Sequence, residues 1–351
     1  MPKFLRRITS RLAASDSAYA EAGVQNCATN GNNTLLSDSK PNLHMIDTDL
    51  IKTLCSIPSV SGHEENMHRF LINYIEKHSG SWKHKPEIIH GPDFQHCVIL
   101  SFGTPRTAVY AHIDSIGFHV RYSNQLVRIG GPKLVSGYTL AGHDSQGSIE
   151  GPLHIDEAEE TISIQFGRSI DRGTALHFKM NFRETADYIQ SCYLDNRLGV
   201  YNALKLAETL EHGVIVFSCW EEHGGGSVPY ITKYLWERFR IRQCLISDIT
   251  WVTEGVPAGE GVVVSLRDSG IPRRSYTDRI IGVLQEAGVR FQLEVEGSGG
   301  SDGNEIQKQP YPIDWCFIGA PEDFVHSPDE RVHKRDLLDM LHAYRVLMNS
   351  L

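Results

Sequence analysis

Short uninterrupted runs of apolar residues alternate along the chain with segments whose apolar residues recur every three or four positions. The runs have the length and composition of buried β-strands, and they are CVILSFG, TAVYAHID, VIVFSCW, CLISDIT and DWCFIGA. The periodic segments predict helices, because apolar residues three or four apart share one helix face. These segments fall within residues 63–80, 200–210, 280–287 and 337–351. The alternation predicts an α/β fold with a mixed, mostly parallel sheet between helices.

Residues 122–183 break this alternation. They are rich in Gly and contain short alternating pieces such as TISIQF, and they hold no convincing helix. We therefore predict a small β-rich, barrel-like domain at 122–183. It is inserted into an α/β domain built from residues 44–121 and 184–351.

The first 43 residues have a different composition. They begin with the basic stretch MPKFLRRITSRLAASDSAYAEAG and continue into an Asn/Ser-rich stretch without an apolar core of the secretory type. A basic, Ser/Ala-rich start also resembles an organelle targeting segment. The composition favours a disordered extension, or a start codon upstream of the folded part.

Charge and cysteine usage narrow the class of protein. Lys and Arg total 34 against 43 Asp and Glu, which gives a net charge of -9 and no basic stripe for nucleic acid. No apolar run approaches the ~18 residues of a membrane span. The seven cysteines are scattered and form no CxxC pair, so we expect reduced thiols, a cytoplasmic location and no cysteine metal site.

Polar residues stand at or just after the ends of apolar runs. They are His112, Asp114, Asp195, Glu221, Glu222, Asp248 and His326. Each one alone is typical of a turn or a cap. Together they fit a metal site, because ligands of open α/β sheets bind beyond the carboxyl ends of the strands, and imidazole with carboxylate suits zinc or a related divalent metal. The number of donors suits two metals ~3.5–4 Å apart, with one carboxylate left as a proton carrier.

Six short motifs carry these residues, and in chain order they are AHIDSIGF, LDNRLG, EEHG, SDIT, GGSDGNEI and VHSPDE. In this order they resemble the glutamyl aminopeptidase/cellulase-M family of metallopeptidases, the tetrahedral aminopeptidases, over about residues 46–351. The resemblance implies a zinc-peptidase-like fold and an enzyme that removes N-terminal residues from peptides. It also implies a homo-oligomer, commonly a dodecamer, in which the inserted domain contributes to assembly and substrate access.

The same resemblance implies two divalent metal ions per subunit, with zinc as the first choice and cobalt or manganese as alternatives. His112 and Asp248 would bind one metal, and Glu222 and His326 would bind the other. Asp195 would bridge both.

The resemblance also implies roles for residues that bind no metal. Asp114 would accept the free ring N–H of His112, and Glu221 would be the general base for a water activated by the two metals. The Asp195–Asn196 bond is a candidate cis peptide. For both carboxylates of Glu221 and Glu222 to face one centre, the chain must leave the strand at this pair, and the glycines at 224–226 supply the freedom to do so.

Some residues have a less defined place in the resemblance. Asp302, in the GGSDGNEI motif, is a candidate for a position just outside the metal ligands. His223 stands where the family usually has a small apolar residue. It either lines the substrate pocket or is a solvated or locally bonded histidine, and the second alternative is favoured.

Three other functions stay open from the sequence. An amidohydrolase or deacylase could use the same two-metal centre, and a scaffold could keep the fold without catalysis. A scaffold is disfavoured because every proposed ligand and the base are present. The endoglucanase activity that the family label suggests is disfavoured because glycosidases normally use two opposed carboxylates without a metal. The long interval between His112 and Asp195 holds the inserted domain, as expected for a tetrahedral aminopeptidase.

Overall fold

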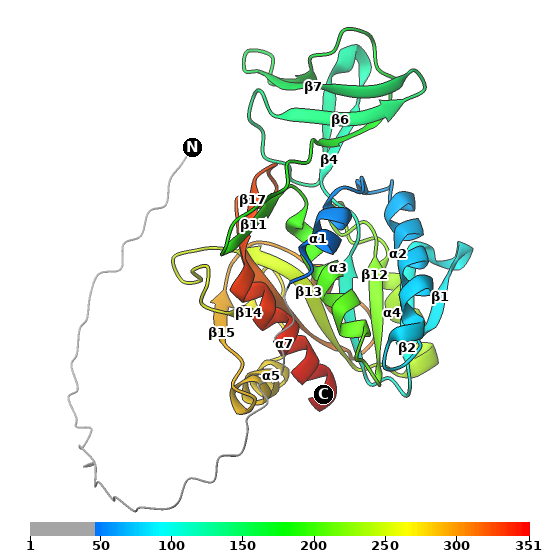
Figure 1. Ribbon diagram of the computed structural model, residues 1–351, viewed down its shortest axis with the longest axis vertical. Helices are drawn as coiled ribbons and strands as arrows, with labels where there is room; N and C mark the ends of the chain where they lie inside the picture. The colour runs from blue at the N-terminus through cyan, green and yellow to red at the C-terminus, as the bar shows by residue number, and fades with distance from the viewer. Residues whose placement is uncertain (1–45) are drawn as a thin grey trace, which may run out of the picture. The chain divides into compact units, whose positions relative to one another are not determined.

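The computed structural model describes residues 46–351, and the predicted N-terminal extension at 1–43 lies outside them. Within the described part, an eleven-stranded mixed sheet is covered by helices, and a second, six-stranded sheet is formed by one continuous segment (Figure 1). The predicted α/β fold with a small barrel-like β unit is confirmed. No helix between residues 46 and 351 has the length and apolar character needed to cross a membrane.

The strands of the large sheet follow the order β1–β2–β12–β3–β13–β16–β17–β11–β10, and β14 and β15 extend from β16. Their bounds are β1 Glu87–Gly91, β2 Gln95–Phe102, β3 Thr107–His112, β10 Arg183–Glu184, β11 Tyr188–Ser191, β12 Gly213–Ser218, β13 Gln243–Trp251, β14 Val262–Arg267, β15 Phe291–Val295, β16 Asp314–Asp323 and β17 Glu330–His333. The central pairs β12–β3, β3–β13 and β13–β16 are parallel. Antiparallel pairs form both edges of the main path.

The centre of this sheet is buried on both faces. Every residue of β3 and β12 is buried, which explains why each strand has a continuous apolar sequence rather than an alternating one. The five apolar runs predicted as strands are β2, β3, β12, β13 and β16. Because β3, β12 and β13 run in parallel, their carboxyl ends lie at the same edge of the sheet.

Seven α-helices accompany the strands in residues 46–351. They are α1 Thr48–Cys55, α2 Glu65–His78, α3 Leu194–Ala207, α4 Val228–Phe239, α5 Arg274–Glu286, α6 Asp302–Gln307 and α7 Lys334–Ser350. Helix α3 packs on β3 and β13 and contacts α1 and α7, while α6 packs on the same two strands and contacts α4. The helices predicted from periodicity are α2, α3, α5 and α7. Helices α1, α4 and α6 are additional.

The second sheet has the order β5–β4–β9–β6–β7–β8, and all its pairs are antiparallel. Its bounds are β4 Gly117–Val120, β5 Leu126–Ile129, β6 Thr139–Asp144, β7 Gly147–Asp156, β8 Thr161–Ile164 and β9 Ala175–Phe178. A single bridge between Gln125 and Ser163 links the two outer strands, so the sheet is nearly closed. It has a hydrophobic core of its own, centred on Phe118, Leu140 and Phe178.

Candidate metal centre

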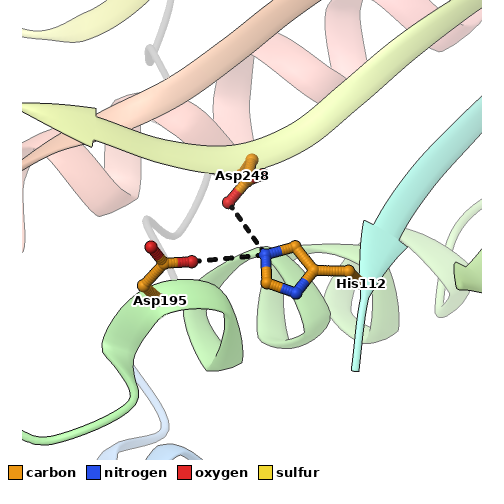
Figure 2. A group of neighbouring side chains, drawn as sticks. All are labelled: His112, Asp195 and Asp248. Atoms are coloured by element: carbon orange, nitrogen blue, oxygen red, sulfur yellow. Dashed lines mark ion pairs between the residues drawn. The ribbon is translucent and has the colours of Figure 1, made fainter. Parts of the chain in front are cut away.

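Three predicted residues from separate elements meet at the carboxyl edge of the large sheet. His112 is the last residue of β3, Asp248 lies in β13, and Asp195 lies in the first turn of α3 (Figure 2). His112 Nε2 is 3.2 Å from Asp195 Oδ1 and 3.6 Å from Asp248 Oδ1. All three side chains are buried, and one donor atom from each lies within 4.8 Å of the other two. This spacing suits ligands of one metal ion.

A second group of three shares Asp195 with the first. His326 Nε2 is 3.3 Å from Asp195 Oδ2 and 3.3 Å from Glu222 Oε2. Donor atoms of these three residues also lie within 4.8 Å of one another. Asp195 therefore points one carboxylate oxygen towards His112 and the other towards His326. A carboxylate in this position can bridge two cations.

The backbone around Asp195 is irregular. Asp195 and Asn196 lie inside α3 but have non-helical torsion angles, and the peptide bond between them is cis, as predicted. The Asn196 amide donates to Ser247 O at 2.9 Å, and its oxygen accepts from Gly199 N at 2.9 Å. These bonds tie the start of α3 to the strand that carries Asp248.

The chain leaves β12 before the paired glutamates, as the sequence predicted. The strand ends at Ser218, Trp220 has a φ of 60°, and Gly225 has a φ of 62°. A Cβ on Gly225 would come within 2.3 Å of the Glu305 side chain, so this turn has both a conformational and a steric need for glycine.

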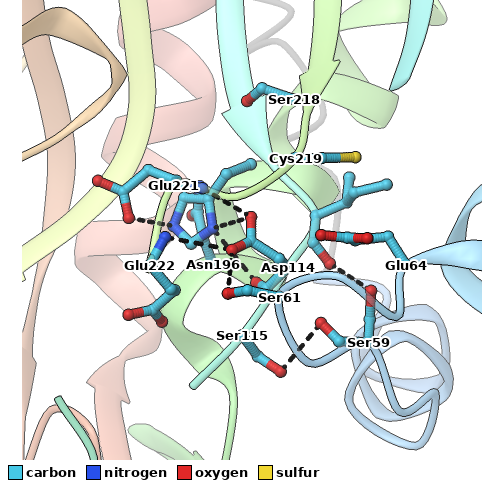
Figure 3. A network of polar contacts seen from close by, with 12 residues as sticks. Ser59, Ser61, Glu64, Asp114, Ser115, Asn196, Ser218, Cys219, Glu221 and Glu222 are labelled. Atoms are coloured by element: carbon cyan, nitrogen blue, oxygen red, sulfur yellow. Dashed lines mark hydrogen bonds and ion pairs between the residues drawn. The ribbon is translucent and has the colours of Figure 1, made fainter. Parts of the chain in front are cut away.

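Asp114 fixes the orientation of the turn that carries the two glutamates. Its Oδ1 accepts from the backbone N–H of Glu221 and its Oδ2 from that of Glu222, both at 3.1 Å (Figure 3). Ser61 Oγ also donates to Oδ2 at 2.7 Å, and His112 Nδ1 lies 3.5 Å from Oδ1. Asp114 thus contacts both the histidine and the glutamate segment. With this support, Glu221 Oε2 lies 3.8 Å from His112 Nε2.

The cluster concentrates negative charge in a buried place. Burial lowers the pKa of His112, but the Asp248 carboxylate and contacts with Asp114 and Asp195 raise it more, so its pKa lies well above the usual range. Burial raises the pKa of both Glu221 and Glu222 well above the usual range, and neighbouring carboxylates add to the effect. Carboxylates outnumber the histidines here, so a divalent cation would offset a large repulsion.

The sequence of the chain matches a known family over more than half of its length. The profile of the M42 glutamyl aminopeptidase family matches residues 153–342. The chain belongs to this family. Membership in the M42 family makes the protein a hydrolytic exopeptidase, which is the enzyme class predicted from the motifs.

The matches between this M42 chain and individual relatives span nearly the whole length of each relative. A curated protein from Acetivibrio thermocellus, named provisionally as an aminopeptidase, is 25% identical over 341 residues, which is 86% of this chain and 98% of the relative. The TET aminopeptidase from the marine sediment archaeon Thaumarchaeota archaeon SCGC AB-539-E09 has a TM-score of 0.75 and 18% identity, with 87% and 97% coverage. The TET1 peptidase of Pyrococcus horikoshii has a TM-score of 0.70 and 20% identity, with 86% and 98% coverage. These two solved structures establish the shared fold.

Two predicted residues of the M42 chain lie outside both groups of donors. Asp302 Oδ2 accepts from Ser218 Oγ at 2.5 Å, and Ser218 is the neighbour of His112 across the β12–β3 pair. His223 is exposed, and its Nδ1 accepts from Gly130 N at 3.3 Å. His223 is therefore a locally bonded histidine, which is the favoured alternative.

Glu330, the last residue of the VHSPDE motif, has a part in the site that its sequence position did not predict. Glu330 is fully buried, and its two oxygens accept from His326 N at 2.9 Å and Asp195 N at 3.3 Å. Arg197 was also missed. It is fully buried and donates to the carbonyl of Ile113 at 2.7 Å. Both residues hold the backbone next to candidate ligands. The available signal was an ionisable residue inside each of the motifs VHSPDE and LDNRLG.

Proposed function

We propose that the protein is a metal-dependent aminopeptidase that hydrolyses the N-terminal residue of peptides at the centre built on Asp195. The observation that carries this proposal is the shared carboxylate, with Oδ1 towards His112 and Oδ2 towards His326. Glu222 and Asp248 complete the two ligand sets. This arrangement is typical of hydrolases that use two metal ions.

The donor set fits two divalent cations. It combines imidazole nitrogen with carboxylate oxygen, which zinc, cobalt and manganese all accept. The Oε1 atom of Glu222 is buried and has no hydrogen-bond partner, as expected for an oxygen that a cation would satisfy. When bound, the ions would polarise the substrate carbonyl and lower the pKa of a water molecule for attack.

Glu221 would carry the proton in this reaction. Its carboxylate lies beside the first group of donors but does not belong to either group. Its Oε2 atom lies 3.8 Å from His112 Nε2, which places the carboxylate within reach of a water held at the first group of donors. It would take a proton from the attacking water and pass it to the leaving amine, while Asp114 holds its backbone in place.

The proposed function is tested by removing and restoring metal. Chelator-treated protein is expected to lose activity on aminoacyl-4-nitroanilides and to regain it when zinc, cobalt or manganese is added back. N-acetylated versions of the same substrates are expected to resist hydrolysis, because an aminopeptidase requires a free amine. Activity restricted to the N-acetylated substrates would contradict the proposal and identify the protein as a deacylase or related amidohydrolase.

We also propose a homo-oligomer, with the β-rich unit at 122–183 contributing to assembly. Support comes from solved relatives described as a dodecamer and as a tetrahedron or large octahedral shell. In the edge strand β15, Leu293 is 47% exposed and Val295 is 66% exposed. Exposed apolar side chains of this kind are typical of a surface that another copy of the chain covers. Light scattering on purified protein is expected to give a mass near twelve times 39.4 kDa. A mass of one subunit across the concentration range would contradict this proposal.

A cytoplasmic location remains part of the proposal. The cysteines at 55, 97, 192, 219, 244 and 316 are all free and buried. Free thiols are typical of proteins kept in a reducing compartment.

A further inference from the structure

The candidate metal centre opens into a cavity of about 250 Å³ that is also lined by carboxylates outside the two groups of donors. Besides the metal-ligating residues and Glu221, three carboxylates line it, and they are Asp268, Glu294 and Glu296. They come from the segment after β14 and from the end of β15. Among the described residues that line this cavity there is no Lys or Arg. We call these three carboxylates the acidic wall.

Two members of the acidic wall are held in fixed positions. Glu294 is buried and accepts a hydrogen bond from Thr250 Oγ1, near the end of β13. Asp268 is also buried and accepts from Gly270 N at 2.5 Å. Glu296 is half-buried and lies just beyond the end of β15, and it lines the same cavity as Glu294. Carboxylates that face a cavity in this way, with no Lys or Arg among its lining residues, provide a site for a positive group.

The cavity also contains a candidate metal ligand. Glu222 lines it, its side chain is only 4% exposed, and its Oε1 atom, which a cation would satisfy, has no hydrogen-bond partner. The acidic wall therefore adjoins the centre at which the peptide bond would be cut. Because Asp268 and Glu294 are themselves buried, the wall is not a solvated surface.

The indole of Trp251 adds an apolar surface to the same cavity. Trp251 is the last residue of β13 and is 37% exposed, which is high for a tryptophan beside a buried cluster. Long basic side chains bury their methylene stems on apolar surfaces and place their charged ends near aromatic rings. The acidic wall and the indole of Trp251 together suit a Lys or Arg side chain better than an aliphatic side chain.

We propose that the acidic wall receives the side chain of an N-terminal Lys or Arg residue, so that peptides with a basic first residue are the preferred substrates. This inference rests on the proposed aminopeptidase function. It differs from the glutamyl specificity in the family's description, since the side chain of an N-terminal Glu or Asp would meet like charges at the acidic wall and no Lys or Arg among the residues that line the cavity. Like-charge contact in a partly buried site disfavours binding.

The competing interpretation is that the acidic wall binds the α-amino group, which every substrate of an aminopeptidase carries. Glu296 distinguishes the two, because it is half-buried and its substitution leaves the hydrogen bond between Thr250 and Glu294 in place. If the wall binds the side chain, Glu296→Gln changes the ranking of substrates. If the wall binds the α-amino group, Glu296→Gln weakens the binding of all substrates equally.

The test compares Lys-, Arg-, Leu- and Glu-4-nitroanilide as substrates of the metal-loaded protein. We expect kcat/KM for Lys and Arg to exceed that for Glu at least about tenfold. Glu296→Gln is expected to lower the Lys-to-Leu ratio of kcat/KM about tenfold, and Glu296→Lys is expected to raise the Glu-to-Lys ratio. Glu286→Gln, an exposed change at the end of α5, should leave the ratios as they are. An unchanged Lys-to-Leu ratio in Glu296→Gln, or Glu as the best substrate, overturns the proposal.

A binding measurement separates this proposal from the proposed chemistry. Calorimetric titration of the Glu221→Gln protein with Lys-Ala and Glu-Ala is expected to give a Kd at least about tenfold lower for Lys-Ala. Equal Kd values overturn the specificity inference even if the enzyme is active. Tight binding of Lys-Ala by a protein whose unsubstituted form hydrolyses no free-amine substrate would instead reject the aminopeptidase function alone.

Discussion

Glu221→Gln is expected to lower kcat by at least about 10²-fold, or roughly 2.7 kcal/mol in activation free energy, while the protein keeps both metals. The amide has nearly the same shape as the carboxylate but does not accept and return a proton. Glu221 lies outside both groups of donors, with Oε2 at 3.8 Å from His112 Nε2. Metal content by elemental analysis and kcat on an aminoacyl-4-nitroanilide check the two parts of this result.

The neighbouring residue provides the contrast. Glu222 Oε2 is 3.3 Å from His326 Nε2, and Glu222→Gln is expected to lower metal content as well as activity. Glu286→Gln, an exposed change of the same kind, controls for the loss of one carboxylate. If Glu221→Gln loses metal and Glu222→Gln keeps it, the roles of the two glutamates are reversed.

The centre of the fold could be predicted because its strands are buried on both faces. Strands β3 and β12 have no solvent-facing side, so each appears in the sequence as an unbroken apolar run that ends in polar residues. The meeting of His112 and Asp248 then follows from a general rule, since parallel strands end at one edge of a sheet. Asp195 was grouped with them as a polar residue after an apolar run, but it lies at the start of α3, and its assignment as the residue that bridges the two metals followed from the family resemblance.

Helix α4 shows why other elements were missed. Its buried residues Val228, Ile231 and Leu235 do follow helical spacing. However, the helix follows three glycines and has Pro229 in its first turn, and it contains several β-branched and aromatic residues of low helix propensity. A proline in the first turn is in fact common, because the N–H it lacks would have no partner there.

The supporting contacts of the site were not predictable from spacing. Glu330 accepts from the backbone of Asp195, which is 135 positions earlier in the chain. Ser61 donates to Asp114 across 53 positions. Such pairs depend on how loops from distant elements meet, and neither hydrophobic periodicity nor local capping rules contain that information.

Asp195→Asn is expected to reduce the binding of both metals, because each oxygen of Asp195 faces a different histidine. The amide removes the negative charge and leaves one weakly donating oxygen for two cations. Outer partners of metal ligands typically contribute 10–100-fold to affinity, so the loss of a shared ligand is expected to cost at least about 10²-fold for each metal. Stepwise titration of metal-free protein, followed by calorimetry, measures both affinities.

His326→Ala provides the comparison that makes this result specific. His326 belongs to one group of donors only, so its substitution is expected to remove one metal and to leave the set of His112 and Asp248 able to hold the other. Asp187→Asn, an exposed change of the same chemistry, should retain two metals, and circular dichroism should give the same spectrum for all three proteins. If Asp195→Asn loses a single metal, as His326→Ala does, then Asp195 serves one cation and the centre is not bridged. Loss of both metals from Asp195→Asn, with one retained by His326→Ala, requires a carboxylate shared between two ions, because no ligand of a single ion would affect both.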